Sequence, residues 1–365
     1  MIDIYSEKIK KIDSFLNTKG KRFLFYHRDA DGVSSAALML KFFPVLIPVP
    51  RRGPRLESEF VDYLIEQKPD LVIFLDLPID QEWKRIDILK KKLPDMRILI
   101  IDHHIPEKNL NSKNVVHFNP KFRHDVYLPA SYLVYRILGK LGKSVGSYVW
   151  IACIGVIGDY GFNECKDLMK ECKKVSPDLL KQDPFKSKLG RGVELISAAI
   201  TLKGLRGADN ALEILIKSDS YEDFAHSGEL SKWKSIVDRE FKNILNKFES
   251  EKKKVKKHKQ SESLDIFPEL NLIIYTIKTR LSMTSSVSSV IAIENPKKTV
   301  VIVRKSGDEW KLSMRNQTGN VNLNKIVKKC VKDIGSGGGH IKAAGALVKD
   351  FEEFKKRFIN ELSSS

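Results

Sequence analysis

Short, continuous apolar segments alternate with helical patterns over the first 160 residues, and this alternation limits the possible folds more than any other feature. The apolar segments lie at residues 22–26, 45–49, 71–75 and 97–101, with helices expected at about 32–43, 57–67 and 80–92. A strand that is apolar on both faces needs cover on both faces of its sheet, which parallel strands with helical crossovers obtain. The pattern therefore predicts an open α/β fold on a parallel sheet, with residues 115–118 as an edge strand.

A second, smaller domain is expected after residue 265, where the pattern changes. Strands are predicted at 271–277, 299–304 and 310–315, and helices at 284–293, 322–332 and 350–361. Before them, residues 229–259 carry apolar side chains at spacings of three and four, which indicates a long amphipathic helix. We therefore expect an α/β domain at 1–200, a helical connector at 201–265 and an α+β substrate-binding domain at 266–365.

The charge balance points to a polyanionic partner. The chain has 64 lysines and arginines against 46 aspartates and glutamates, which gives a formal net charge of +18. A surplus of this size favours nucleic acid as the partner, and a well-solvated, lysine-rich surface is the alternative explanation.

The cysteines and the apolar segments indicate the cellular setting. None of the four cysteines forms a CxxC pair, which argues against a disulfide framework or a zinc knuckle and fits a reducing compartment. No stretch approaches the roughly 18 apolar residues needed to cross a bilayer, and the N-terminal segment lacks the apolar core of a signal peptide. We therefore expect a cytoplasmic protein without a membrane partner.

Acidic residues stand where the predicted strands end. Asp29 and Asp31 follow the first strand, Asp76 follows the third, and Asp102 follows the fourth. Asp159 lies at the end of an apolar helical segment further along the chain. Because ligands of open α/β sheets bind beyond the carboxyl ends of the strands, we expect these side chains to converge on one crevice.

Several carboxylates in one crevice repel one another and favour protonation. Two divalent cations would neutralise them, and carboxylate oxygens combined with imidazoles suit Mn²⁺ or Mg²⁺ better than a metal that prefers thiolates. A pair of such ions can hydrolyse a phosphodiester, because it activates a water molecule and stabilises the leaving oxygen. The acidic residues therefore predict a two-metal phosphodiesterase site.

Four motifs occur in the order and at the spacing of a known family. HRDADG (27–32) fits the pattern HxDxDG, Asp76 ends a strand, DHH stands at 102–104, and GDYG stands at 158–161. Together they resemble the DHH phosphoesterases, and the C-terminal SGGGH (336–340) resembles the substrate-binding domain associated with that family. The family includes RecJ-type single-strand exonucleases, oligoribonucleases that also cleave 3′-phosphoadenosine phosphate, and cyclic-dinucleotide phosphodiesterases. Family II pyrophosphatases carry a different C-terminal domain, so the GGGH segment argues against them.

The resemblance implies a set of metal ligands. His27 and Asp29 would bind one ion, Asp31, His103 and Asp159 would bind the other, and Asp76 would bridge the two. Many members place the first histidine four residues before the first aspartate, a position that is Phe25 here. His27 lies two residues further on, on the same strand face, and would either replace that ligand or contact the substrate. Two Mn²⁺ ions are the expected cofactors, with Mg²⁺ as the alternative.

The resemblance also assigns catalytic and substrate-binding residues. Asp102 would orient the site, and His104 would face the scissile phosphate and help to protonate the leaving oxygen. In the second domain, the expected phosphate clamp consists of Gly337, Gly338, Gly339, His340 and Arg315. The glycines would let backbone N–H groups approach a phosphate, as glycine-rich loops do elsewhere.

These expectations favour metal-dependent hydrolysis of single-stranded DNA or RNA from an end, in an active site between the two domains. The alternative among enzymes is a nanoRNase or 3′-phosphoadenosine phosphate phosphatase that acts on very short oligonucleotides. An alternative of another class is a non-catalytic replication or repair scaffold, against which the intact aspartates and histidines argue. The sequence leaves open the cleavage polarity, the choice between DNA and RNA, homo-oligomerisation and any replication or repair proteins as partners.

Overall fold

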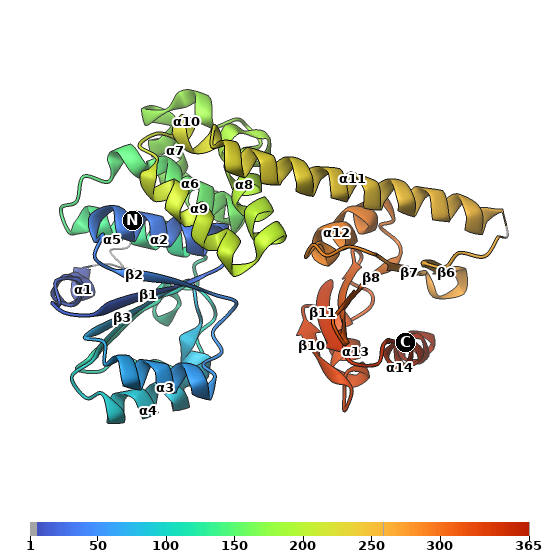
Figure 1. Ribbon diagram of the computed structural model, residues 1–365, viewed down its shortest axis with the longest axis horizontal. Coiled ribbons are helices and arrows are strands. Elements are labelled where there is room, and N and C mark those ends of the chain that lie inside the picture. The colour runs from blue at the N-terminus through green and yellow to red at the C-terminus, as the bar shows by residue number, and fades with distance from the viewer. Residues whose placement is uncertain (1–5, 258, 365) are drawn as a thin grey trace. The chain divides into compact units, whose positions relative to one another are not determined.

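The chain divides into two compact units, Met1–Lys234 and Ser235–Ser365, in a computed structural model that describes residues 6–257 and 259–364 (Figure 1). Each unit has its own hydrophobic core. Short 3₁₀ turns lie at Ile79–Glu82, Pro120–Phe122, Gly146–Tyr148, Gly161–Asn163, Pro177–Leu179, Pro184–Lys186 and Pro268–Leu270.

The first unit is built on a five-stranded parallel sheet with the strand order β2-β1-β3-β4-β5. Its strands are β1 (Arg22–His27), β2 (Ile47–Arg51), β3 (Leu71–Leu75), β4 (Arg97–Ile101) and β5 (Val115–Phe118). The predicted parallel sheet and its edge strand at 115–118 are confirmed. β2 begins two residues later than expected and is partly exposed, because it is the other edge strand. It carries Pro48 and Pro50, whose backbones lack the N–H that an inner strand needs.

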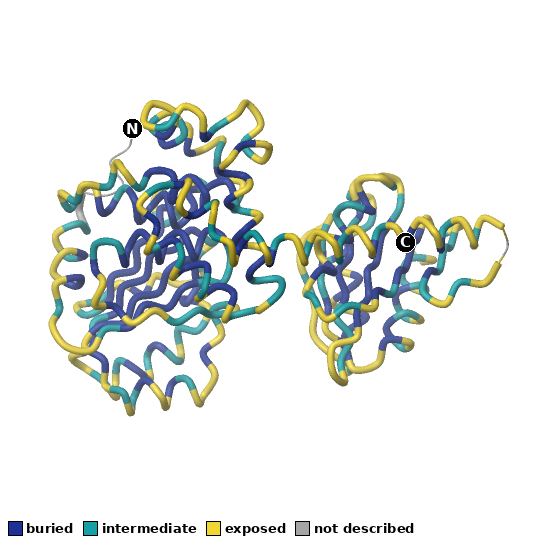
Figure 2. Tube along the Cα trace, turned by 45° about the horizontal axis from the view of Figure 1, so that its top comes forward, coloured by how far each residue is buried: buried dark blue, intermediate teal, exposed yellow. Residues whose placement is uncertain are grey.

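Helices cover both faces of this sheet (Figure 1). α3 (Ser58–Gln67) and α4 (Trp83–Lys92) lie against one face, and α1 (Ser6–Leu16), α2 (Ala30–Phe42) and α5 (Ala130–Lys140) lie against the other. α6 (Val149–Gly158) packs on α2 and α5. Successive strand residues point to opposite faces, so Phe23 and Phe25 enter the core with α3, whereas Leu24 and Tyr26 enter the core with α2. Figure 2 shows the strands as largely buried.

Further helices complete the first unit. They are α7 (Lys166–Val175), α8 (Lys188–Lys203), α9 (Leu205–Lys217), α10 (Tyr221–Ala225) and the start of α11 (Gly228–Lys256). α9 packs against α2, and its Ala211 and Leu215 belong to the same core as the sheet. The expected domain boundary at residue 200 falls inside α8, so residues 201–234 belong to the first unit rather than to a connector.

The second unit contains a six-stranded mixed sheet with the order β10-β11-β9-β8-β7-β6. Its strands are β6 (Leu264–Phe267), β7 (Leu272–Thr276), β8 (Thr299–Ser306), β9 (Glu309–Asn316), β10 (Gly335–Gly339) and β11 (Ala343–Val348), and its helices are α12 (Thr284–Glu294), α13 (Leu323–Cys330) and α14 (Phe351–Ser363). The predicted α+β fold is confirmed, as is the hairpin of β8 and β9. The glycine run forms edge strand β10 rather than a loop.

The later part of α11 belongs to the second unit. Its Ile244 and Phe248 pack in a core with residues of β7 and α12. Within residues 6–257 and 259–364, no helix combines the length and the apolar character needed to cross a membrane.

Candidate metal centre

The turn between β1 and α2 presents the first acidic residues. Asp29 is the N-cap of α2, and its side chain accepts a hydrogen bond from the Gly32 N–H. A Cβ atom on Gly32 would lie only 2.1 Å from the carbonyl oxygen of His27, so glycine is required where the helix starts against the end of the strand. The HRDADG motif is therefore a strand-to-helix turn that directs His27, Asp29 and Asp31 to the carboxyl edge of the sheet.

Asp76 occupies the position directly after β3 in a left-handed backbone conformation, with φ of +57°. This conformation costs a non-glycine residue on the order of 1 kcal/mol, although aspartate tolerates it better than most residues. The buried Asp76 carboxylate lies between two histidines: Oδ2 is 3.3 Å from His27 Nδ1, and Oδ1 is 3.2 Å from His103 Nε2. One carboxylate therefore reaches two separate groups of side chains.

The structure brings all six expected metal ligands together. The ligand atoms of each of three groups lie within 4.8 Å of one another: His27, Asp29 and Asp76; Asp31, His103 and Asp159; and Asp76, His103 and His104. The first two groups match the division expected for the two ions. The third group shows that His104 is also close enough to Asp76 and His103 to bind a shared ion, a role that the family resemblance does not assign to it.

Asp31 is buried and is anchored by the start of α5. Its Oδ2 accepts a hydrogen bond from the Ala130 N–H at 2.6 Å, and its Oδ1 accepts one from the Ser131 N–H at 2.9 Å. The positive end of the helix dipole favours the carboxylate form at this position. Each carboxylate oxygen has a second lone pair, which leaves Asp31 able to bind a cation as well.

The electrostatics of the cluster favour the addition of positive charge. Burial and the neighbouring Asp76 carboxylate raise the pKa of Asp31, and burial raises the pKa of Asp159. Burial lowers the pKa of His27, but hydrogen bonds to Asp29 and Asp76 outweigh it and raise the pKa to about 11. Each of these shifts favours the protonated form of its group, so added positive charge is stabilised at this position, and a divalent cation would supply it in place of protons.

The donor set fits a hard divalent cation. It consists of carboxylate oxygens and imidazole nitrogens, without a thiolate. Among the described residues, the buried Asp76 Oδ2 has His27 Nδ1, at 3.3 Å, as its close partner, and the buried His103 Nδ1 has no hydrogen-bond partner. A carboxylate oxygen has two lone pairs, so Asp76 Oδ2 can bind a cation in addition to this contact.

Asp102 and His104 form a pair beside the cluster. The fully buried Asp102 carboxylate lies 2.8 Å from His104 Nδ1 and accepts a hydrogen bond from the His104 N–H at 3.2 Å. The His104 side chain is 42 % exposed, and its ring centroid lies 4.6 Å from that of His103. This geometry agrees with the expected orienting role of Asp102, which is in none of the three ligand groups.

Two contacts around the cluster were missed by sequence reasoning. The Tyr127 hydroxyl donates to Asp159 Oδ2 at 2.6 Å, and the buried Asp80 carboxylate accepts hydrogen bonds from the N–H groups of Glu107 and Lys108. Asp80 therefore supports the loop that follows the DHH motif. Tyr127 lies in an irregular segment 32 residues before Asp159, so no periodicity or spacing connects the two residues.

The expected phosphate clamp of the second unit spans three strands. Arg315 of β9 pairs with Ala343 of β11, and the His340 N–H donates to the Ala343 carbonyl at 2.7 Å, beside the end of β10. The Arg315 guanidinium donates to the hydroxyls of Ser285 and Ser289 on α12. Arg315 and His340 therefore lie in one row across the sheet.

Glycines are required in β10 because the strands lie close together. A Cβ on Gly337 would lie 2.8 Å from the Gly345 carbonyl oxygen and from a Val327 methyl group. Gly337 and Gly339 are exposed, and as part of an edge strand they present backbone groups along the open side of the sheet. The glycine run is thus an edge strand paired with β11, and its role in a phosphate clamp stays a prediction.

The fold and this acidic, histidine-containing cluster define a class of α/β proteins with a candidate metal site at the carboxyl edge of a parallel sheet. Residues 21–155 match the DHH family, N-terminal domain, and residues 270–364 match the DHHA1 domain. The chain is therefore a DHH-family phosphoesterase with a C-terminal DHHA1 domain, as the motifs indicated.

Solved structures give the same fold. A crystal structure of exonuclease RecJ bound to manganese is 20% identical, with a TM-score of 0.68, and the match covers 98% of this chain and 94% of that one. RecJ from Thermus thermophilus in complex with Mn²⁺ is also 20% identical, with a TM-score of 0.70, and the match covers 98% of this chain but 54% of that protein. CDC45 from Entamoeba histolytica is 11% identical, with a TM-score of 0.57 and coverage of 98% and 99%. No curated protein sequence gives a significant match.

Proposed function

We propose that this protein is a two-metal phosphodiesterase that hydrolyses single-stranded DNA or RNA from an end. The observation that carries the proposal is the position of Asp76, whose two oxygens face the two ligand groups. His27 and Asp29 would hold one ion, and Asp31, His103 and Asp159 the other. Mn²⁺ is the expected ion and Mg²⁺ the alternative, and solved RecJ structures with each ion support this choice.

When bound, a pair of divalent ions supplies an activated water and neutralises charge on the phosphate. The remaining steps belong to the protein. Asp102 holds His104 through Nδ1, which leaves His104 Nε2 as the position from which a proton would reach the leaving oxygen. Asp102 acts on the substrate only through this histidine and is a positioning residue.

An arginine-rich pocket next to the centre supports a phosphate-containing substrate. Arg51 pairs with His27 in the β1–β2 register. Together with Arg52 and Arg55, it lines a cavity of about 370 Å³. Arg51 itself is engaged by Glu57 at 3.1 Å and lies over the Phe60 ring. Arg52 and Arg55 are exposed and would contact phosphates of the substrate.

The choice of nucleic acid as substrate has two further supports. The net charge of +18 favours a polyanion longer than a nucleotide. The row of Arg315, His340 and the exposed edge of β10 provides the second unit with a site that would hold a terminal nucleotide. A non-catalytic scaffold, the alternative of another class, would have no need for the complete ligand set.

The test is hydrolysis of 5′- and 3′-labelled single strands of DNA and RNA by metal-free protein, before and after addition of Mn²⁺, Mg²⁺ or Ca²⁺. We expect no hydrolysis without a metal, the highest rate with Mn²⁺, and binding without turnover with Ca²⁺, which is larger and a weaker Lewis acid. Full activity in excess chelator would contradict the metal assignment. Oligonucleotide binding without hydrolysis under every metal condition would instead support the scaffold alternative.

A further inference from the structure

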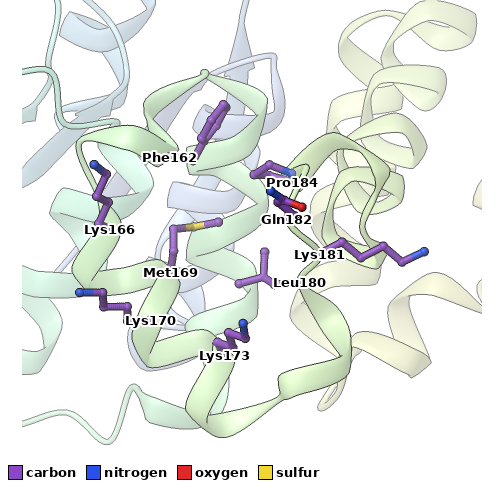
Figure 3. A pocket seen from close by; sticks show the side chains of 9 residues that line it. All are labelled: Phe162, Lys166, Met169, Lys170, Lys173, Leu180, Lys181, Gln182 and Pro184. Carbon is purple, nitrogen blue, oxygen red and sulfur yellow. The ribbon is translucent and has the colours of Figure 1, made fainter.

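The lysines of α7 lie on one face of the helix and line a pocket. Lys166, Lys170 and Lys173 are spaced by four and three residues, which places them within one helical face, and all three are exposed. They line a cavity of about 420 Å³ together with Lys181, and Figure 3 shows the side chains around this cavity. Among the described residues, none of these four lysines has an ion-pair partner.

The acidic residues of the same helix do not neutralise this face. Asp167 and Glu171 are paired with Arg136 at 2.9 and 2.7 Å, and they also accept hydrogen bonds from the hydroxyls of Tyr132 and Tyr135. α7 therefore has one face where negative charge is fully engaged and another where positive charge is left open. Such an arrangement attracts a polyanion to the lysine side alone.

The cavity between the lysines has an apolar lining. Phe162, Met169, Leu180 and Pro184 provide it, and all four are partly buried (Figure 3). An inorganic anion would gain nothing from this surface, whereas a ligand that carries an apolar ring beside its negative charge would use both features.

An exposed aromatic cluster connects this cavity to the metal centre. Tyr160 directly follows the ligand Asp159 and is 70% exposed, and its ring centroid lies 5.0 Å from that of Phe185. Phe185 in turn contacts Phe162, with ring centroids 5.7 Å apart. Phe162 is three residues after Asp159, so their Cα atoms are at most about 11 Å apart. The ring contacts therefore link Tyr160, the residue after Asp159, to Phe162 in the lysine-lined cavity.

We propose that this surface, formed by Tyr160, Phe162, Phe185, Lys166, Lys170, Lys173 and Lys181, is a track for single-stranded nucleic acid leaving the metal centre. Bases would stack on the aromatic rings while successive phosphates follow the lysines, a combination that binds single strands without sequence preference. The inference rests on the proposed function for the position of the reacting end. It adds that the first unit itself binds several nucleotides beyond that end.

The main test measures, for two triple variants, how the affinity for a labelled 12-mer oligonucleotide depends on the salt concentration. Binding is measured in the presence of chelator. Replacing Lys166, Lys170 and Lys173 with Gln should reduce the slope of log affinity against log salt by about 2, since each single-strand phosphate contact contributes about 0.7. The matched control replaces Lys19, Lys91 and Lys92, which are exposed lysines elsewhere in the first unit. Equal slopes in the two triple variants would overturn the proposal.

Two further variants separate charge from folding and from general anion binding. Replacing the same three α7 lysines with Arg should keep the slope of the unmodified protein, which would show that the Gln variant lost charge rather than structure. Phe185→Leu should weaken binding of the 12-mer about fivefold or more by loss of stacking, and should leave binding of inorganic polyphosphate unchanged. Unchanged binding of the 12-mer by Phe185→Leu would overturn the track in favour of a general anion surface.

The same experiments distinguish this inference from the proposed function. Hydrolysis of a dinucleotide by the unmodified protein depends on the metal centre, whereas the salt slope is measured without metal. Absence of hydrolysis with a reduced slope in the Gln variant would reject the proposed function and keep the track. A photoreactive thymine in the 12-mer should also crosslink to peptides that contain Tyr160 or Phe185, and crosslinks confined to other peptides would reject the track.

Discussion

The Tyr127 hydroxyl donates a 2.6 Å hydrogen bond to Asp159 Oδ2, and it also lies 3.0 Å from the Asp159 backbone carbonyl. One side chain thus holds both the carboxylate and the backbone of a proposed metal ligand at the end of α6. The same Asp159 oxygen is 3.3 Å from His103 Nε2, so Tyr127 fixes the distance between two members of one ligand group.

Tyr127→Phe should weaken Mn²⁺ binding about tenfold to a hundredfold, because hydrogen bonds that orient a ligand typically contribute that much to metal affinity. Titration calorimetry of the metal-free protein with Mn²⁺ measures the effect. Tyr132→Phe is the matched control, since it removes a 2.9 Å hydrogen bond to Asp167, which is not a proposed ligand. Equal Mn²⁺ affinity in both variants would show that Tyr127 only stabilises the fold.

Asp76→Asn should lower the hydrolysis rate by roughly three orders of magnitude or more, because one residue serves both proposed ions. Asparagine tolerates the left-handed backbone of this position, so the variant should fold normally. Oligonucleotide affinity should change far less, since the lysine and arginine surfaces remain. Rates are compared with those of Asp95→Asn, which alters an exposed aspartate after α4. Similar rates in the two variants would place the active centre elsewhere.

His117 should make the stability of the first unit depend on pH. It is fully buried on β5, and neither ring nitrogen has a hydrogen-bond partner among the described residues. Burial lowers its pKa to about 4 in the folded state, whereas the unfolded value is about 6.5. Between these values the unfolded state binds more protons, so stability falls as the pH is lowered, by about 2 kcal/mol at pH 5.

Urea unfolding at pH 7 and pH 5 checks this dependence. His117→Leu removes the buried imidazole, so the difference in unfolding free energy between the two pH values should shrink by about 2 kcal/mol. The exposed His226 provides a control, and His226→Gln should leave the difference as it is in the unmodified protein. An unchanged difference in His117→Leu would mean that His117 is protonated in the folded state.

The convergence of these side chains could be predicted from the sequence because the geometry of a parallel sheet determines most of their positions. The carboxyl ends of β1, β3 and β4 meet at one edge, so residues that directly follow them, such as Asp76 and His103, must come together. Asp159 was identified through its motif. It lies at the end of α6, close to Asp31 and His103 at the carboxyl edge of the sheet. These residues are fixed by regular elements, whose register the apolar pattern reveals.

Other features could not be predicted because they depend on loops and edges. Tyr127 lies in an irregular segment, where no periodicity indicates which way a side chain points. The glycine run was expected as a loop, but its pairing with β11 is a long-range contact that composition does not show. The end of α11 is rich in lysine, but Lys252 and Lys254 are paired with Glu249 and Glu251 three residues earlier, which the charge balance alone does not show.

Arg52 and Arg55 should affect substrate binding rather than the chemical step. Replacing both with Gln should raise KM for single strands about tenfold with little change in kcat, because the proposed phosphate contacts exist before and during the reaction. Arg85→Gln on α4 is a control for the loss of a cation from the first unit. A large fall in kcat without a change in KM would mean that the arginines contact the reacting phosphate itself.

The length of the preferred substrate distinguishes an exonuclease from a nanoRNase. Both use the same metal centre, so variants of the ligands cannot separate them. A clamp of Gly337, His340 and Arg315 alone would recognise one terminal nucleotide, and longer strands would gain nothing from it. A positive track continues to gain with each phosphate until it ends, so kcat/KM should rise from two to about ten nucleotides.

The measurement is the initial rate on single strands of DNA and RNA of increasing length, at fixed moderate salt and with Mn²⁺. His340→Ala should lower the rate at every length, because the end of the strand must still be held. Lys91→Gln, on α4, should leave the whole profile unchanged. A maximum at about two to four nucleotides, with negligible cleavage of longer strands, would replace the exonuclease proposal with a nanoRNase or 3′-phosphoadenosine phosphate phosphatase. In that outcome the surfaces beyond the terminal nucleotide would contribute nothing to catalysis, since each added phosphate would fail to lower the barrier.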